Sequence, residues 1–293
     1  MIRTPAFESF IAPAQRYPQI WRIILGVISA LVVYIVFAFV IVYGVGAAVG
    51  LEDPMMIFFQ LVEPDSPFAM ATLLLTFFAM AFGAFAAVAW HWRSPFSLLG
   101  RGMSRPFFLM IGLTLFVLLL GGFIVGFIIP TSTTPARDFT PWLISMAWAI
   151  PLLFVQITAE ELVFRGYLQQ QLAARFRSSI IWLLIPSLLF GSAHFNPELG
   201  QSTALLIVLA TTVFGLIAAD LTRITGNLGA AMGLHLANNF IALFIVAIPG
   251  ELSGLALREA DFTMADAHIV HPLVFIDIGL LIIIWLAARR ILR

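Results

Sequence analysis

The sequence lacks two residue types on which many hydrolases and metalloproteins depend. It contains no cysteine, which excludes disulfides, a thiol nucleophile and zinc sites built on cysteine. It also contains no lysine, because all fifteen basic residues are arginine. This excludes Schiff-base chemistry, a Ser–Lys dyad and a Walker A phosphate loop. Any chemistry must therefore come from Asp, Glu, His, Ser, Thr, Tyr, Asn and Arg side chains.

Charged residues of either sign are also scarce. They make up 10% of the 293 residues and sum to a net charge of zero, which gives no electrostatic basis for binding nucleic acid. Hydrophobic residues reach 61% and the mean hydropathy is +1.04. We therefore predict an all-α, polytopic bundle in contact with membrane lipids, with 1–293 forming a single integral membrane domain.

Eight apolar runs are candidates for transmembrane helices. They fall at about 20–50, 68–92, 107–130, 142–164, 180–195, 203–220, 228–248 and 270–288. A spanning helix needs roughly 20 residues. The fifth and sixth runs are short by this measure, and we expect them to be re-entrant or tilted.

The distribution of arginine predicts how the bundle is oriented. Arginines precede the first run, separate the second from the third, follow the fourth, precede the seventh and follow the eighth; they are Arg3, Arg16, Arg22, Arg93, Arg101, Arg105, Arg175, Arg177, Arg223, Arg289, Arg290 and Arg293. The alternate loops carry mostly carboxylates. The positive-inside rule then places both termini in the cytoplasm.

Two adjacent carboxylates interrupt the fourth apolar run. Glu160 and Glu161 lie there, and Arg165 follows them. A carboxylate in hydrocarbon costs about 2.5–3.5 kcal/mol on insertion scales, so such residues are candidates for function. Glu161 and Arg165 are four residues apart and can pair on one helix face. Glu160 points about 100° away from Glu161 and is free to face a cavity.

Further polar residues lie in two other apolar runs. His194 ends the fifth run, and the seventh run holds His235 and Asn239, four residues apart on one face. If the fourth and fifth runs form an antiparallel hairpin, Glu160 and His194 lie at about the same height. This requires the polar stretch 165–179 to project into the cytoplasm.

This set of residues can support hydrolysis in two ways. A desolvated Glu160 can act as a general base on water, with His194 sharing the proton, while His235 and Asn239 stabilise an oxyanion. Alternatively, Glu160, His194 and His235 can hold a zinc ion whose bound water attacks. The residues alone do not decide between a metal-free site and a zinc site.

Three motifs give the chain a resemblance to a known family. Glu160-Glu161-Leu-Val-Phe-Arg165, Phe190-Gly-Ser-Ala-His194 and His235-Leu-Ala-Asn-Asn239 resemble the EExxxR, FxxxH and HxxxN motifs of the CPBP intramembrane proteases. This family includes CAAX prenyl endopeptidases and the bacterial Abi or bacteriocin-processing proteins. The resemblance covers about 140–250, which we take as the catalytic core.

The resemblance implies an intramembrane endopeptidase that cuts a membrane-associated or lipidated protein or peptide. By position, Glu160 and His194 would activate water, and His235 and Asn239 would stabilise the oxyanion. Glu161, Arg165 and Phe190 would be structural. The family is often labelled metalloprotease, so a divalent metal such as zinc is a possible cofactor. We expect a multi-pass protein of the bacterial inner (plasma) membrane.

Alternatives of other classes remain open at this stage. The same fold could act without catalysis as an immunity or scaffold protein, and intramembrane carboxylates and histidines also occur in proton-coupled transporters. A purely structural polar network is the simplest alternative. Outside the motifs, we expect Asp220 to pair near Arg223, Asp277 to hydrogen-bond between helices, and His91 to be solvated.

Overall fold

Long apolar helices make up most of the chain. The computed structural model describes residues 3–129 and 131–292, so Pro130 and Arg293 lie outside the described residues. Within that part of the chain, six helices are long and apolar enough to cross a membrane. Five of them are α2 (Ile20–Ala48), α4 (Pro67–Ala89), α5 (Ser104–Ile128), α9 (Gln201–Thr225) and α11 (Ala267–Ile291).

The other long helix is a composite that carries the two glutamates. It runs without a break through α6 (Phe139–Glu161), the π-helical segment η4 (Leu162–Gln169) and α7 (Gln170–Arg175). Two shorter apolar helices complete the eight predicted runs. They are Ile180–Ser192, made of the π-helical η5 (Ile180–Leu184) and α8 (Ile185–Ser192), and Gly229–Ile245, made of α10 (Gly229–Phe240) and the π-helical η7 (Ile241–Ile245).

The sequence correctly predicts a short fifth segment but is wrong about the sixth. The sixth segment, α9, has 25 residues, because polar residues at both ends extend the helix beyond its apolar run. Gly226 ends it in the left-handed conformation (φ +67°), which glycine adopts without strain. The seventh segment is the short one instead.

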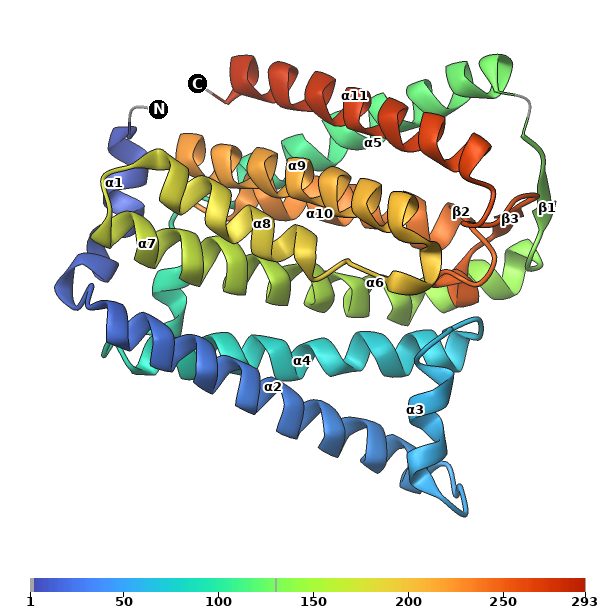
Figure 1. The fold of residues 1–293 in the computed structure, drawn as a ribbon, viewed down its shortest axis with the longest axis horizontal. Coiled ribbons are helices and arrows are strands. Elements are labelled where there is room, and N and C mark those ends of the chain that lie inside the picture. The colour runs from blue at the N-terminus through green and yellow to red at the C-terminus, as the bar shows by residue number, and fades with distance from the viewer. Residues whose placement is uncertain (1–2, 130, 293) are drawn as a thin grey trace.

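Minor helical elements cover the two ends of the bundle. They are α1 (Pro5–Ile11), η1 (Ala12–Arg16), η2 (Pro54–Met56), α3 (Ile57–Gln60), η3 (Pro95–Leu98), η6 (Pro197–Leu199) and η8 (Ser253–Leu255). Both termini lie at one end of the bundle, beside α1 and α7 (Figure 1). This agrees with an even number of passes, and the arginine-rich loops lie at the same end. The assignment of this end to the cytoplasm stays a prediction.

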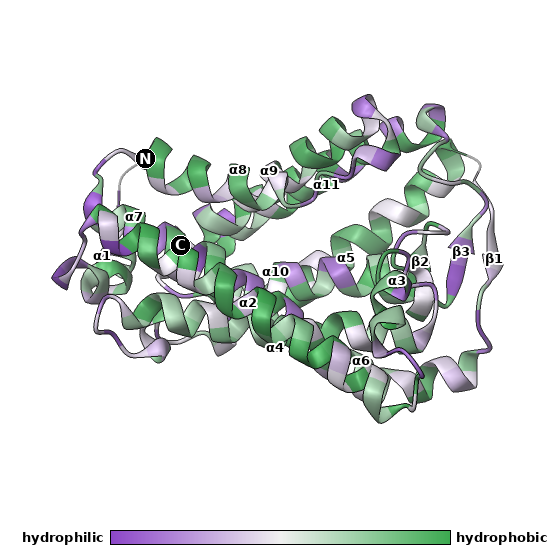
Figure 2. Cartoon of the chain, turned by 60° about the horizontal axis from the view of Figure 1, so that its bottom comes forward, coloured by the Kyte–Doolittle hydropathy of each residue, from purple (hydrophilic) through white to green (hydrophobic). Residues whose placement is uncertain are grey.

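A three-stranded sheet closes the opposite end, which an all-α prediction does not include. The strands are β1 (Thr133–Pro135), β2 (Val246–Ala247) and β3 (Arg258–Ala260), in the order β1-β3-β2. β3 pairs antiparallel with β1 and parallel with β2. It therefore ties the loop before α6 to the loop before α11. β3 is hydrophilic, whereas much of α2 and α4 is hydrophobic (Figure 2).

Much of the polar stretch after Glu161 is buried against other parts of the protein, whereas Arg175, Arg177 and Ser178 near its end are exposed. That the stretch 165–179 projects into the cytoplasm stays a prediction. Gln170 and Gln171 are both 0% exposed. Gln170 Nε2 donates to the carbonyl oxygens of Phe10 and Ser97, and Arg93 Nη1 donates to Gln171 Oε1 at 2.7 Å. The N-terminal helices and the α4–α5 connection thus supply hydrogen-bond partners that composition alone does not reveal.

His91 is part of this buried layer and is not solvated. It is 0% exposed, its Nδ1 lies 2.8 Å from the carbonyl oxygen of Tyr17, and its Nε2 lies 3.0 Å from the Tyr167 hydroxyl. These contacts tie the segment before α2 and the residue after α4 to the η4 segment. They hold in place the helix that carries the glutamates.

Candidate active site

A buried carboxylate, Glu161, joins two helices and a cation. It is 0% exposed, and its Oε1 accepts hydrogen bonds from Arg165 Nη1 at 2.9 Å and from His235 Nδ1 at 2.8 Å. The predicted Glu161–Arg165 pair is therefore present. Since an ionised carboxylate only accepts hydrogen bonds, His235 presents Nδ1–H to Glu161. This contact fixes the orientation of the imidazole ring and leaves Nε2 for other contacts.

The neighbouring Glu160 has one constrained oxygen and one free oxygen. Its Oε1 accepts a hydrogen bond from Gln156 Nε2 at 2.7 Å. Its Oε2 is buried, has no hydrogen-bond partner among the described residues, and lies 3.4 Å from His235 Nε2. An unsatisfied carboxylate oxygen in a buried site needs a hydrogen-bond donor. A water molecule or a polar substrate group can supply that donor.

Gln156 connects Glu160 to the end of the HxxxN motif. Its Oε1 accepts a hydrogen bond from Asn239 Nδ2 at 3.2 Å, and Asn239 Oδ1 accepts one from Asn238 Nδ2 at 3.3 Å. The hydrogen-bond network therefore runs from Asn238 through Asn239 and Gln156 to Glu160, whose other oxygen lies 3.4 Å from His235 Nε2. Because the Asn239 amide has two N–H groups, one remains available for another acceptor.

The helix spacing explains how one segment supplies several of these groups. Gln156 and Glu160 are four residues apart, as are Glu161 and Arg165, so each pair lies on one helix face. The π-helical η4 segment begins directly after the glutamates. π-Helical segments within α-helices occur frequently at functional sites. Within this segment, Arg165 Nη2 lies 3.5 Å from the carbonyl oxygen of Gly215 on α9.

Aromatic rings enclose the imidazole of His235. The ring centroid of Phe214 lies 4.9 Å from it and that of Phe190 lies 6.0 Å away. The Arg165 guanidinium lies over the Phe190 ring at 4.6 Å. Phe190 thus packs against both the guanidinium of Arg165 and the imidazole of His235. Apolar surroundings strengthen the electrostatic interactions of this cluster.

His194 stands apart from the glutamate cluster. It lies in the turn after α8, is exposed, and its Nδ1 lies 2.8 Å from the Phe190 carbonyl oxygen. Since a carbonyl oxygen only accepts, Nδ1 carries the proton and Nε2 is the free acceptor of the neutral ring. Among the described residues, no hydrogen bond joins His194 to Glu160. The structure therefore shows no direct contact between these two residues.

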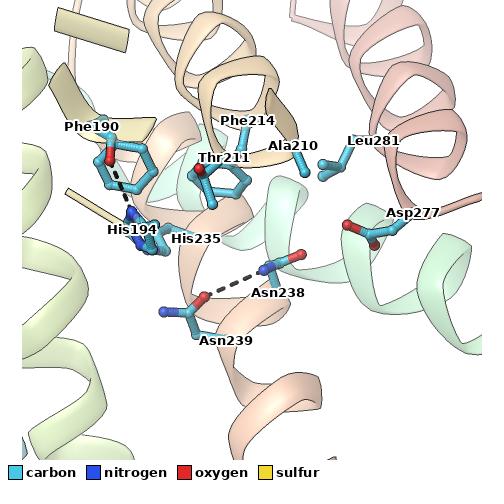
Figure 3. Close-up of a pocket in the computed structure, with 10 residues that line it drawn as sticks. All are labelled: Phe190, His194, Ala210, Thr211, Phe214, His235, Asn238, Asn239, Asp277 and Leu281. Atoms are coloured by element: carbon cyan, nitrogen blue, oxygen red, sulfur yellow. Dashed lines mark hydrogen bonds between the residues drawn. The ribbon is translucent and has the colours of Figure 1, made fainter. Parts of the chain in front are cut away.

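A cavity of about 100 Å³ lies beside this cluster (Figure 3). His194 and His235 both line it, together with Asn238, Asn239 and Asp277, and the apolar part of the wall includes Phe190, Phe214 and Leu281. Its size exceeds that of a single water molecule, whose share of liquid volume is about 30 Å³. Two imidazoles and two amides thus face one common space; His235, Asn238 and Asn239 come from α10, and His194 comes from the turn after α8.

The predicted zinc ligands do not form a metal site. Among the described residues, no group of three or more His, Asp or Glu side chains is arranged to hold a metal ion. His235 uses Nδ1 on Glu161, and His194 uses Nδ1 on the Phe190 carbonyl. Both contacts leave Nε2 free, which is also the usual arrangement of a histidine that binds a metal, so they do not decide the fit. Because Glu160, His194 and His235 are not grouped in the described structure so that they could hold an ion together, we derive no catalytic step through a metal.

Some polar residues of this region differ from their sequence-based interpretation. Gln156 was detectable, because it precedes Glu160 by the same four residues that relate Glu161 to Arg165, yet the motifs do not include it. Asp277 has no interhelical hydrogen bond among the described residues and instead lines the cavity. Asp220 does pair with Arg223, at 2.7 Å.

Comparisons with known proteins agree with the motifs. Residues 141–241 match the family model described as Type II CAAX prenyl endopeptidase Rce1-like. An uncharacterized protein of Bacillus subtilis (strain 168), YyaK, is 31% identical over 166 residues, which cover 51% of this chain and 54% of that protein. The chain thus spans about half the length of this curated relative. No solved structure matches the chain significantly.

Proposed function

We propose that this chain is an intramembrane protease of the CPBP type, an endopeptidase that cleaves a membrane-associated or lipidated protein or peptide. The protein is an integral, multi-pass membrane protein, and we place it in the inner (plasma) membrane of a bacterium. In this proposal Glu160, His194, His235 and Asn239 are the catalytic residues of the core 140–250. Glu161, Arg165 and Phe190 hold them in position.

One observation supports the proposal most directly. Glu160 Oε2 is buried without a hydrogen-bond partner among the described residues, while Gln156 fixes the other oxygen of the same carboxylate. A carboxylate held in this way is oriented to accept a proton from a water molecule. The imidazole Nε2 of His235 lies 3.4 Å from the same oxygen, so the attacked carbonyl group can approach both residues.

The proposed reaction is a water-mediated hydrolysis. Glu160 Oε2 takes a proton as the water oxygen bonds to the scissile carbonyl carbon. The carbonyl oxygen becomes an oxyanion, which accepts hydrogen bonds from His235 Nε2–H and from the second N–H of Asn239. When the C–N bond breaks, the proton passes to the leaving amine, with the free Nε2 of His194 relaying it.

The geometry refines the part played by Glu161. His235 can donate from Nε2 only in its doubly protonated form, because Nδ1–H is already bound to Glu161. The Glu161 carboxylate faces that cation at Nδ1 and also accepts from Arg165 Nη1. Glu161 is thus a positioning residue for the oxyanion donor as well as a partner of the guanidinium.

The test replaces Glu160 by Gln. The Gln side chain keeps the shape and can still accept from Gln156, but it cannot take a proton. We expect Glu160→Gln to lower kcat by roughly 10²–10⁴-fold on internally quenched, acylated peptides in proteoliposomes. The melting temperature in detergent should stay close to that of wild type. Glu52→Gln removes a charge from an exposed loop residue and serves as the matched control.

Two results would overturn the proposal. Unchanged turnover by a folded Glu160→Gln protein would remove Glu160 from the mechanism. Purified wild-type protein that cleaves no member of a broad peptide library would favour a binding protein of the same fold over an enzyme.

A further inference from the structure

An acidic residue of the last membrane-spanning helix faces the catalytic cavity. Asp277 lies near the middle of α11, among isoleucines and leucines. A carboxylate at such a position costs about 2.5–3.5 kcal/mol on insertion scales and usually marks a ligand or ion contact. Neither the family motifs nor the proposed reaction uses this residue.

The side chain of Asp277 faces the cavity rather than a neighbouring helix. It lines the same space as His194, His235 and Asn239, and it points from α11 toward Asn238 (Figure 3). Within the described chain, its carboxyl group has no hydrogen-bond or ion-pair partner. The cavity therefore exposes an acceptor group that the protein leaves unused.

Asp220, a second aspartate of the same bundle, has the hydrogen-bond partners expected of a structural residue. Asp220 on α9 accepts from Arg223 Nε at 2.7 Å and from Trp285 Nε1 at 2.9 Å. Both of its oxygens are thereby satisfied, as is usual for buried polar groups. Asp277 differs on this point, although it lies on the same helix as Trp285. A packing role therefore does not account for Asp277.

The charges around the cavity indicate the sign of the missing partner. Asp277 is the acidic residue among those that line the cavity, and no arginine is among them. A carboxylate in a low-dielectric space without a basic partner favours a positively charged ligand. A Lys or Arg side chain can satisfy Asp277 with a charge-assisted hydrogen bond.

Asp277 also lies where the catalytic cavity meets a larger apolar one. Asn238 and Asp277 line both spaces. The second cavity has a volume of about 490 Å³, and its walls include Leu118, Ile241, Phe262 and Leu273. A peptide segment with apolar residues in this cavity would pass Asp277 before it reaches His235 and Asn239.

We propose that Asp277 is a specificity residue that binds a Lys or Arg side chain of the peptide substrate, close to the scissile bond. The substrate class is thus a membrane-associated peptide in which a basic residue adjoins apolar ones. This inference rests on the proposed endopeptidase function, because the apolar cavity and the carboxyl group would otherwise have no peptide to hold.

The experiment compares peptide preferences of wild type and Asp277 variants. The probes are internally quenched, acylated peptides in proteoliposomes, with Lys, Arg, Gln, norleucine or Asp at each position around the cleavage site. In wild type, one position should favour Lys or Arg over norleucine by at least tenfold in kcat/KM, through KM. In Asp277→Asn that ratio should fall to about one. Asp277→Arg should invert it toward Asp.

Controls separate failure of this inference from failure of the proposed function. Glu52→Gln removes a distant exposed charge and should keep the wild-type ratio. Asp277→Leu suits an apolar helix and replaces Asp277→Asn if that protein does not fold. A wild type without any preference for a basic residue, or an Asp277→Asn protein that keeps the preference, would overturn the inference alone. A wild type that cleaves no peptide would overturn the proposed function itself, and with it this assignment.

Discussion

Replacing Arg165 by Met measures what the buried ion pair contributes to stability. Arg165 and Glu161 are 1% and 0% exposed, and Arg165 Nη1 lies 2.9 Å from Glu161 Oε1. Met keeps much of the aliphatic stem but removes the charge. Loss of one partner of a buried pair costs about 3–5 kcal/mol in free energy of unfolding. We expect a value near the lower bound, because His235 Nδ1–H still binds Glu161 Oε1.

The double-mutant cycle with Glu161→Gln tests this reasoning. In the double variant no charge of the pair remains buried, and replacing a buried pair by neutral residues is often close to neutral. The double variant should therefore be more stable than Arg165→Met. Titration with SDS in mixed micelles, followed by tryptophan fluorescence, gives the free energies of unfolding. If Arg165→Met is as stable as wild type within about 0.5 kcal/mol, the pair does not stabilise the bundle.

Gln156 and His91 provide two separate tests. Gln156→Leu removes the donor to Glu160 Oε1 and the acceptor for Asn239. We expect kcat to fall roughly 10²-fold with little change in KM. An unaltered kcat would contradict the proposal that Gln156 positions Glu160 and Asn239. Burial lowers the pKa of His91 below 6.5, and Arg93 adds to the effect. The unfolded chain then binds the proton more readily, so the stability from neutral His91 is complete above pH 6.5 and is lost as the pH falls below that value. The melting temperature of wild type should therefore drop more than that of His91→Asn between about pH 7 and about pH 5, and parallel curves would count against this assignment.

Helix periodicity predicted the contacts within single helices well. Two residues four apart must share a face, and this places Arg165 on Glu161. The same rule, applied one step earlier, gives the hydrogen bond between Gln156 and Glu160. The HxxxN motif identified His235 as a candidate. Spacing within one helix could not show that His235 lies next to both glutamates, because it lies on another helix.

Periodicity alone is a weak guide to how helices are placed relative to one another. The expectation that Glu160 and His194 lie at the same height assumed two regular antiparallel helices of equal arm length. Both helices instead contain π-helical segments, Leu162–Gln169 and Ile180–Leu184, which change the residue count per turn and so the register between them. His235 on α10 occupies the position next to Glu160, and His194 faces the cavity from a turn.

Composition could not distinguish a buried polar segment from a solvated one. The glutamines after Arg165 look hydrophilic, yet their partners come from residues about 75 to 160 positions earlier in the chain, such as Phe10, Arg93 and Ser97. The small sheet was undetectable for a related reason. Its strands have two or three residues each, too few to show an alternating pattern.

The adjacency of the two glutamates has a geometric consequence for catalysis. Neighbouring helical residues project about 100° apart, so their carboxylates can approach one imidazole ring from two sides. Glu161 binds Nδ1 of His235 at 2.8 Å, and Glu160 lies 3.4 Å from Nε2 of the same ring. One carboxylate therefore orients the histidine, while the other keeps an oxygen without a hydrogen-bond partner among the described residues, as the proposed mechanism requires. Since Glu161 Oε1 is shared with Arg165, a substitution at Arg165 disturbs the position of His235 as well as the stability of the bundle. Loss of activity in Arg165→Met should accordingly appear even at temperatures where the protein is fully folded.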